Sequence, residues 1–527
     1  MGLKAYASDL NPVAVMINKS MIEIPPKFAG QPPVNPESKK LFGTWEGMQG
    51  LAEDVRYYGE WMKQKAWERI GHLYPKVRDG KGKEHTVIAW LWARAVKCPN
   101  PACGCVTPLV SSFVLSKRRG SETYVQPIIE DKSIRYEVRY GKKAPDGTMR
   151  RRNGAVCIFC DHPIDYAHIK AEGHAKRIKH HLMAIAAEGK GSRLYFSPDE
   201  THVSATKIEK PENIPEGVMP RQALGFVAQL YGPKQYTDLF TNRQLSALIT
   251  FSDLVAETQK QITIDGGSKK YAEDVAVYLA FLIDKMADLG NSLSGWEPNA
   301  QCPRHLFARQ TIPIVWDFAE ANIFSESSGS WSVFLNNLTR SFSSDLFDFV
   351  REKPGQADQL DAQRDNGLRN VMISTDPPYY DNIGYADLSD FFYIWLRRSL
   401  KQIYPELFRT LLVPKSDELV ATPYRFDNNI DKAKNFFEDG MLKTFKQVLI
   451  YTHDDIPVSI YYAFKQTESV SEGLNGNTTA STGWETMLSA IIQSGFAITG
   501  TWPIRTEMSS RAAAQGNNAL ASSIVIV

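Results

Sequence analysis

Four consecutive residues in the last third of the chain, Asp376-Pro377-Pro378-Tyr379, combine groups that could act on a nucleobase. An exocyclic amino group such as N6 of adenine is a poor nucleophile, because its lone pair is delocalised into the ring. The Asp376 carboxylate and the Pro377 carbonyl could accept its two N–H bonds and make the nitrogen more reactive. The prolines stiffen the turn, and Tyr379 offers a ring for stacking on a base taken out of the double helix. The alternative is a plain Pro-Pro turn.

Five of the six cysteines lie within residues 98–160. The two close pairs are Cys98 with Cys103 and Cys157 with Cys160. Two such pairs can supply four thiolates to one tetrahedral zinc ion, which we expect to be structural, because four thiolates leave no open position for catalysis. Three alternatives stay open: Cys105 replaces Cys103, His162 replaces one thiolate, or the cysteines are buried without a metal.

The stretch that contains these cysteines is basic. Residues 91–190 hold 18 Lys and Arg against 9 Asp and Glu, a net charge of +9, whereas the whole chain carries only +2. Two runs of three basic residues suit contact with phosphate groups without reading of the base sequence, and the alternative is an ordinary solvated surface. The candidate nucleic-acid contacts are Lys117, Arg118, Arg119, Arg150, Arg151 and Arg152.

Alternating strands and helices are expected to position these groups. Residues 4–9 predict a short strand that ends at Asp9, and residues 371–374 predict a strand that runs directly into Asp376. This alternation favours a mostly parallel sheet covered on both faces. Ligands of such sheets bind beyond the carboxyl ends of the strands, so we expect Asp9 and Asp376 at the ligand side.

The remaining pattern predicts further elements. A Pro-rich loop over residues 25–36 follows a helix that begins at Asn11-Pro12, and the region from residue 85 is β-rich. Helices are expected at 51–74, 165–187, 240–290 (interrupted near Gly266-Gly267) and 431–450, with strands at 458–463, 496–501 and 522–527.

The tetrad resembles the catalytic motif of the DNA amino-methyltransferases, in which aspartate in first place is commoner in the adenine-N6 group and serine in the cytosine-N4 group. More specifically, the chain resembles the adenine-specific DNA methylases that contain a zinc ribbon, also described by their domain of unknown function 1156. The matching stretches keep one order over almost the whole chain: residues 6–14, 238–244, 316–322, 376–381, 501–507 and 519–523.

The resemblance implies S-adenosylmethionine as the methyl donor. It implies that Asp9 closes the second strand of the sheet and accepts bonds from the ribose hydroxyls of this cofactor, with Asn11 and Pro12 beside it. From the residues alone, an aspartate in this place is more typical of a helix cap. The family places a first strand and a Gly-rich cofactor loop before this point, so we expect these two features to be missing from the printed chain.

We therefore expect an α/β protein with a Rossmann-like S-adenosylmethionine-dependent methyltransferase sheet, split by a large insert with a β-rich zinc ribbon and a helical part. The expected parts are residues 1–84 and 306–527 for the two halves of the methyltransferase domain, 85–190 for the basic zinc-ribbon insert, and 191–305 for a mixed or helical insert, a candidate for target recognition. Weaker site candidates are Trp316, Asp317, Glu320, Asn322, Arg505 and Glu507.

The expected function is methylation of N6 of a flipped adenine in double-stranded DNA, in a restriction-modification or phage-defence setting with restriction or defence proteins as partners. Two alternatives are a truncated, inactive remnant that still binds nucleic acid, and an N-methyltransferase of RNA or of protein amides. Related enzymes of the last kind favour asparagine in the place of Asp376. No run of ~18 apolar residues and no secretory signal occur, so we expect no membrane contact and a cytoplasmic location.

Overall fold

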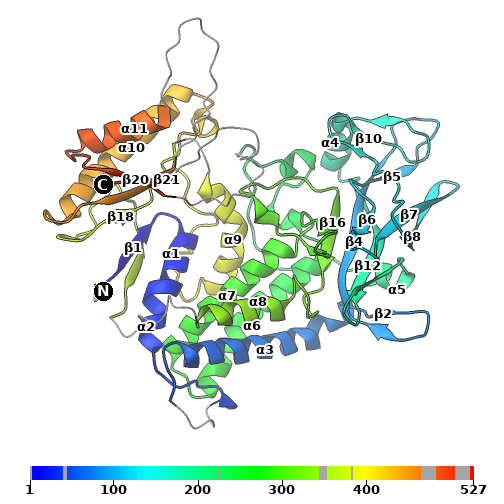
Figure 1. The fold of residues 1–527 in the computed structure, drawn as a ribbon, viewed down its shortest axis with the longest axis horizontal. Coiled ribbons are helices and arrows are strands. Elements are labelled where there is room, and N and C mark those ends of the chain that lie inside the picture. The colour runs from blue at the N-terminus through cyan, green and yellow to red at the C-terminus, as the bar shows by residue number, and fades with distance from the viewer. Residues whose placement is uncertain are drawn as a thin grey trace, which may run out of the picture.

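The computed structural model describes residues 3–38, 44–223, 225–343, 353–380, 384–463, 482–504 and 523–527. Three parts lie along the longest axis of the molecule: two small sheets with helices at one end, a helical body in the middle, and a β-rich insert at the other end (Figure 1). None of the described helices is long and apolar enough to cross a membrane.

The first strand and helix form as the sequence predicts. Strand β1 (Tyr6–Asp9) precedes helix α1 (Pro12–Asn18), and the side chain of Asn11 caps this helix by accepting the N–H of Val13 at 3.0 Å. Strand β1 pairs in parallel with β17 (Gln356–Gln359), so Asp9 lies opposite Gln359. The chain then continues through a π-helical turn into α2 (Ile24–Phe28). The loop predicted for residues 25–36 was therefore wrong at its start, because proline is tolerated in the first turn of a helix.

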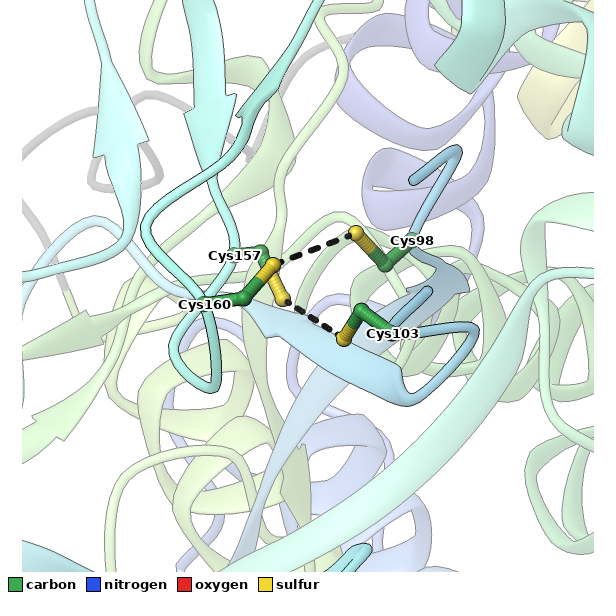
Figure 2. Close-up of side chains that lie close together, drawn as sticks. All are labelled: Cys98, Cys103, Cys157 and Cys160. Atoms are coloured by element: carbon green, nitrogen blue, oxygen red, sulfur yellow. Dashed lines mark hydrogen bonds between the residues drawn. The ribbon is translucent and has the colours of Figure 1, made fainter. Parts of the chain in front are cut away.

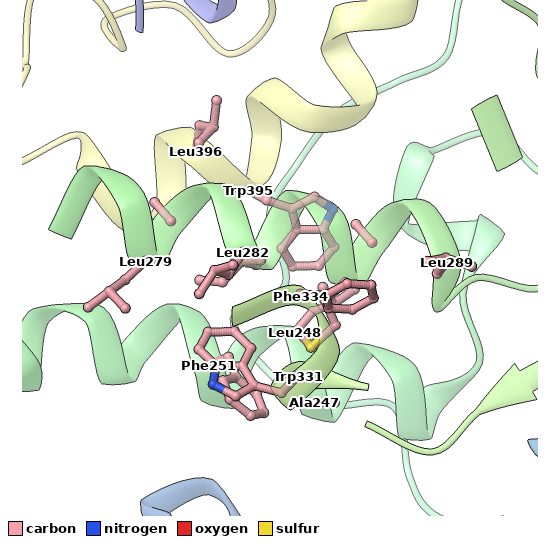
Figure 3. Close-up of a cluster of buried hydrophobic side chains, with 14 of the residues drawn as sticks. Ala247, Leu248, Phe251, Leu279, Leu282, Leu289, Trp331, Phe334, Trp395 and Leu396 are labelled. Carbon is pink, nitrogen blue, oxygen red and sulfur yellow. The ribbon is translucent and has the colours of Figure 1, made fainter. Parts of the chain in front are cut away.

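Five helices form the central body: α3 (Gln49–Ile70), α6 (Asn242–Ile264), α7 (Lys269–Leu289), α8 (Trp331–Ser341) and α9 (Tyr385–Leu400). Their apolar faces meet in one core, part of which Figure 3 shows. The rings of Phe251 and Trp331 lie 4.3 Å apart, and the Trp331 indole donates to the Gly59 carbonyl of α3 at 2.8 Å. The interruption predicted near Gly266-Gly267 is confirmed, because it separates α6 from α7.

The insert is built on an antiparallel sheet in the order β13-β12-β4-β16, with β5 also pairing with β4. These strands are β4 (Val87–Lys97), β5 (Val106–Leu109), β12 (Lys179–Glu188), β13 (Arg193–Phe196) and β16 (Asp317–Ala321). The helix predicted for 165–187 was wrong in its second half: α4 (Tyr166–His174) ends before Lys176, whose φ is +57°, and β12 follows. Leu182–Ala187 is buried on both faces of the sheet, so its apolar run carries no period that distinguishes strand from helix.

Two three-stranded sheets flank this insert. One is β6 (Val114–Ser116), β7 (Thr123–Glu130) and β8 (Ser133–Tyr140); the other is β9 (Met149–Arg150), β10 (Gly154–Val156) and β11 (Pro163–Ile164). Shorter elements are β2 (Val77–Arg78), β3 (Glu84–His85), α5 (Glu200–Ser204), β14 (Trp296–Glu297) and β15 (Cys302–Pro303).

The C-terminal part of the chain forms a four-stranded sheet with the strand order β18-β19-β21-β20. Its strands are β18 (Ser374–Thr375), β19 (Ser459–Ala463), β20 (Thr501–Ile504) and β21 (Ser523–Ile526), with α10 (Ile430–Tyr451) and α11 (Thr482–Gln493) beside it. Strands β18 and β19 are parallel, whereas β21 is antiparallel to both of its neighbours. The predicted terminal pair is confirmed, but its first strand begins at Thr501, because Phe496 and Ile498 pack on the core before it.

Candidate active site and metal centre

The tetrad begins directly after β18, at the carboxyl end of a strand that pairs in parallel with β19. Thr375 lies opposite Ile460, and Asp376 follows as an exposed residue, whereas Pro377 is buried. The carboxylate therefore projects from the edge of the sheet while the proline behind it is fixed by packing. The strand predicted for residues 371–374 is shorter and lies later, at Ser374–Thr375, with Val371 in an isolated bridge to Thr452, but it leads directly into Asp376 as predicted.

Tyr379 is coupled to Asp376 through its hydroxyl, which donates a hydrogen bond to the carboxylate. Partial burial raises the pKa of Asp376, and the hydrogen bond from Tyr379 opposes this shift. Burial and the adjacent Asp376 charge raise the pKa of Tyr379 to about 12, so it remains a phenol at neutral pH. The Tyr379 ring packs edge-on against Tyr462 at 5.4 Å. The residue therefore holds the carboxylate as well as offering a ring.

Asp9 and Asn11 form a polar end to β1. The Asp9 carboxylate accepts the backbone N–H of Asn11 at 2.7 Å, and Asp9 is exposed. Asn11, rather than Asp9, caps helix α1, and Pro12 occupies its first turn. Asp9 is therefore not the cap of α1, since Asn11 has this role. The Asp9 carboxylate lies at the exposed end of β1.

Helix α9 brings the two strand ends together. Its Ser389 hydroxyl accepts a hydrogen bond from the Asn11 side chain at 2.7 Å. One turn earlier, about 6 Å along the helix axis, burial raises the pKa of Tyr385, and so does the nearby negative charge of Asp376. The end of β1 and the end of β18 thus lie beside the first two turns of one helix, although they are far apart in the sequence.

A buried ionic network supports this part of α9. The Arg425 guanidinium contacts Asp387 at 3.0 Å and Glu418 at 2.7 Å, and the Glu418 carboxylate accepts the N–H of Ala386 at 2.8 Å. Sequence reasoning missed Tyr385 and this network. The one signal in the sequence was the stretch after Gly384, which contains no glycine or proline and could have indicated a helix close to the tetrad.

The four predicted cysteines form the one group of metal-ligand residues found in the part of the chain that the structure describes. All four sulfur atoms lie within 4.8 Å of one another, and Figure 2 shows them converging from two loops. The Sγ atoms of Cys98 and Cys160 are 3.8 Å apart, as are those of Cys103 and Cys157. Zinc–thiolate bonds of about 2.3 Å in a tetrahedron give sulfur separations of about 3.8 Å, so the group has the dimensions of a four-thiolate metal site.

The two loops have matching turns. Cys98 donates its N–H to the Cys105 carbonyl, and Gly104 follows the second cysteine with φ +59°. In the other loop Asp161 follows Cys160 with φ +57° and donates to the Cys157 carbonyl. Strands β5 to β10 lie between the pairs, which explains the long gap in the sequence.

The alternatives from the sequence do not fit as well. Cys105 and His162 are outside the four-residue group, and the Cys105 thiol is directed at the Cys103 carbonyl at 3.5 Å. Burial raises the pKa of the Cys98 thiol to about 12, whereas the backbone N–H of Cys105 lowers the pKa of Cys103 to about 7. Because a metal binds thiolates, loading of this group releases protons.

The two predicted basic runs lie on different sheets. Lys117–Arg119 forms the exposed turn between β6 and β7, whereas Arg150–Arg152 lies at the turn between β9 and β10. The Arg150 guanidinium folds back on the carbonyls of Gly147 and Met149. The structure therefore divides the candidate nucleic-acid residues into two separate surfaces.

Several weaker candidates lie away from the tetrad. Glu320 is buried in an ion pair with Arg243 at 2.8 Å and also accepts the Trp92 indole N–H at 2.9 Å. Asp317 accepts the Ser111 N–H within the insert. Trp316 packs in the small core of the metal-binding region, and Asn322 caps a turn at the end of the insert sheet. Arg505 and Glu507 lie outside the described residues.

Comparison of the chain with family models, with curated proteins and with solved structures gives no match. The family resemblance therefore rests on the sequence stretches alone. A groove of about 700 Å³ lies between α3 and the start of β4 and is lined by neither Asp9 nor Asp376. The chemistry is therefore argued from the convergence on α9 and not from the size of a groove.

Proposed function

We propose that the protein transfers a methyl group from S-adenosylmethionine to N6 of an adenine flipped out of double-stranded DNA. The observation that carries the proposal is the meeting of two strand ends beside α9. One end bears Asp9 and Asn11, the other bears Asp376 and Tyr379. In open α/β sheets, ligands bind outside the carboxyl ends of strands where the strand order reverses.

The order of the strands supports the same proposal. In a doubly wound sheet with the order 3-2-1-4-5, β17, β1, β18 and β19 correspond to positions 3, 2, 4 and 5. In the described residues, β1 and β18 each pair with a neighbour on one side only. A parallel strand between them would join the two sheets into one, with Asp9 and Asp376 on either side of its carboxyl end.

The residues present fit both substrates. The exposed Asp9 carboxylate could accept hydrogen bonds from the hydroxyl groups of the cofactor ribose. The Asp376 carboxylate and the Pro377 carbonyl accept the two N–H groups of adenine N6. The nitrogen lone pair then forms the new C–N bond as the methyl–sulfur bond breaks, and one N6 proton leaves towards Asp376. Catalysis rests on positioning and electrostatics.

For the metal centre we propose a structural zinc ion. Four thiolates complete a tetrahedral shell and leave no site for substrate. A restriction-modification or phage-defence role, with restriction or defence proteins as partners, and a cytoplasmic location remain proposals that follow from the family resemblance.

The test is transfer of labelled methyl groups from S-adenosylmethionine to unmodified double-stranded DNA. The unchanged protein should be compared with two aspartate variants. Asp376→Ala should abolish transfer, and Asp365→Ala should not, since that exposed carboxylate is bound by the Arg369 guanidinium and the Gly367 N–H. Retained methyl transfer in Asp376→Ala would refute the mechanism. Transfer to RNA or protein instead of DNA would favour the alternative substrates.

A further inference from the structure

The sheet formed by β6, β7 and β8 brings two basic segments together at one end. Lys117–Arg119 lies in the turn that joins β6 to β7, and Lys142 and Lys143 follow β8. In the antiparallel register of β7 and β8, Thr123 lies opposite Tyr140, and the Gly141 N–H continues the ladder to the Glu122 carbonyl at 2.8 Å. The residues before Thr123 and after Tyr140 are therefore neighbours in space.

This basic end carries a strong local charge. Its cations are Lys117, Arg118, Arg119, Arg139, Lys142 and Lys143, and all six are exposed. Lys142 lies 3.6 Å from Glu122, and Arg139 lies 2.9 Å from Glu137. No acidic partner within 4 Å is found, in the described part of the chain, for the other four. Most of the positive charge is thus available to an anion from outside.

The turn that presents these cations is ordered by its own hydrogen bonds. The Ser121 N–H donates to the Arg118 carbonyl at 2.9 Å, and Gly120, with φ +80°, donates to the Glu122 carboxylate at 3.0 Å. The opposite face of the sheet is anchored through the buried side chains of Val125 and Tyr136. Because the backbone is fixed, little additional ordering is needed when a ligand binds.

We propose that this basic end binds the phosphate backbone of double-stranded DNA as an anchor that does not read sequence. The proposal rests on DNA as the substrate under the proposed function. Three strands span about 10 Å, and duplex DNA carries one charge per about 1.7 Å of its axis, so several phosphates can face the six cations. The basic end lies in the β-rich insert, whereas β18 lies at the opposite end of the molecule (Figure 1). Its role is therefore affinity, with the target base bound elsewhere.

The test measures binding of a short fluorescein-labelled DNA duplex by anisotropy, without methyl donor, over about 50 to 200 mM salt. Each phosphate contact contributes about 0.9 to the slope of log K against log salt. The double variant Lys142→Gln/Lys143→Gln should therefore lower the slope by about 2, and Lys117→Gln/Arg118→Gln/Arg119→Gln by about 3.

A matched control removes the same charge elsewhere: Lys443→Gln/Lys446→Gln, on the exposed side of α10, should leave the slope unchanged. Unchanged slopes in both basic-end variants, an equal fall in the α10 control, or tighter binding of a single-stranded oligonucleotide would each overturn the anchor. The measurement needs no methyl transfer. If the transfer assay fails but the two basic-end variants lower the salt slope as expected, the proposed function is refuted and the anchor is not. If transfer is active but the variants keep the wild-type slope, only the anchor is refuted.

Discussion

Replacement of single cysteines should distinguish the four metal ligands from the nearby cysteine that does not bind metal. We expect Cys103→Ser to reduce zinc binding strongly and Cys105→Ser to leave one zinc per chain, although the two positions are only two residues apart. The reason is geometric: the Cys103 sulfur lies 3.8 Å from that of Cys157, whereas Cys105 lies outside the four-residue group.

The size of the effect follows from what the serine removes. Loss of an outer-shell partner of a metal ligand lowers affinity about 10–100-fold. Loss of a ligand removes a bond to the metal itself, so the apparent affinity should fall by at least about 100-fold, or about 3 kcal/mol. Cys98 and Cys157 are buried in a small core with Ala155, Ile164 and Ile169. Without metal, this core should open before the helical body does.

The assay is competition with a chromophoric chelator, combined with metal analysis of the purified protein. Hydrogen exchange should show faster opening of β10 and α4 in Cys103→Ser than in the wild type, with α6 and α7 unchanged. Cys302→Ser serves as a second control, because Cys302 lies in β15 outside the group. Full zinc content in Cys103→Ser, or its loss in Cys105→Ser, would refute the assignment.

Three further predictions concern the site and the core. Tyr379→Phe removes the hydrogen bond that lowers the pKa of Asp376, so the acid limb of the methyl-transfer pH profile should move to higher pH, by less than about one unit because Asp376 is exposed; an unmoved limb contradicts the coupling. Arg243→Met leaves the buried Glu320 carboxylate without its cation and should cost about 3–5 kcal/mol in urea unfolding, and adding Glu320→Leu should recover much of it. Asn11→Ala removes the α1 cap, worth about 1 kcal/mol, and the bond to α9, so calorimetry should find S-adenosylhomocysteine bound roughly fivefold more weakly.

The sequence predicted the local features of the site because each depends on adjacent residues. Asn11-Pro12 specifies a helix start through a side-chain cap and a fixed φ, and Pro377-Pro378 specifies a turn. The four cysteines were also predictable, because a tetrahedral metal requires paired ligands at short spacing. The helix start and the turn need no knowledge of distant parts of the chain, whereas the meeting of the two cysteine pairs depends on the strands β5 to β10 between them.

Contacts across long stretches could not be predicted in the same way. Nothing in the local pattern of Ser389 indicates that it accepts a bond from Asn11, and the influence of the Asp376 charge on the pKa of Tyr385 depends on where α9 lies. The second half of the predicted helix 165–187 failed for a related reason. Its apolar residues are buried on both faces by other elements, so tertiary packing and not local period decides the conformation.

The packing of α9 makes the helical body part of the site's support. Its first two turns carry Tyr385 and Ser389, but its later residues are buried in the helical body. Phe240, from the segment before α6, stacks on Phe391 at 5.6 Å and meets Trp395 edge-on at 5.6 Å. Truncation of the Phe240 ring should therefore loosen the helix beside which the ends of β1 and β18 lie. The helical body, of which Phe240 is part, thus supports the geometry of the proposed active site.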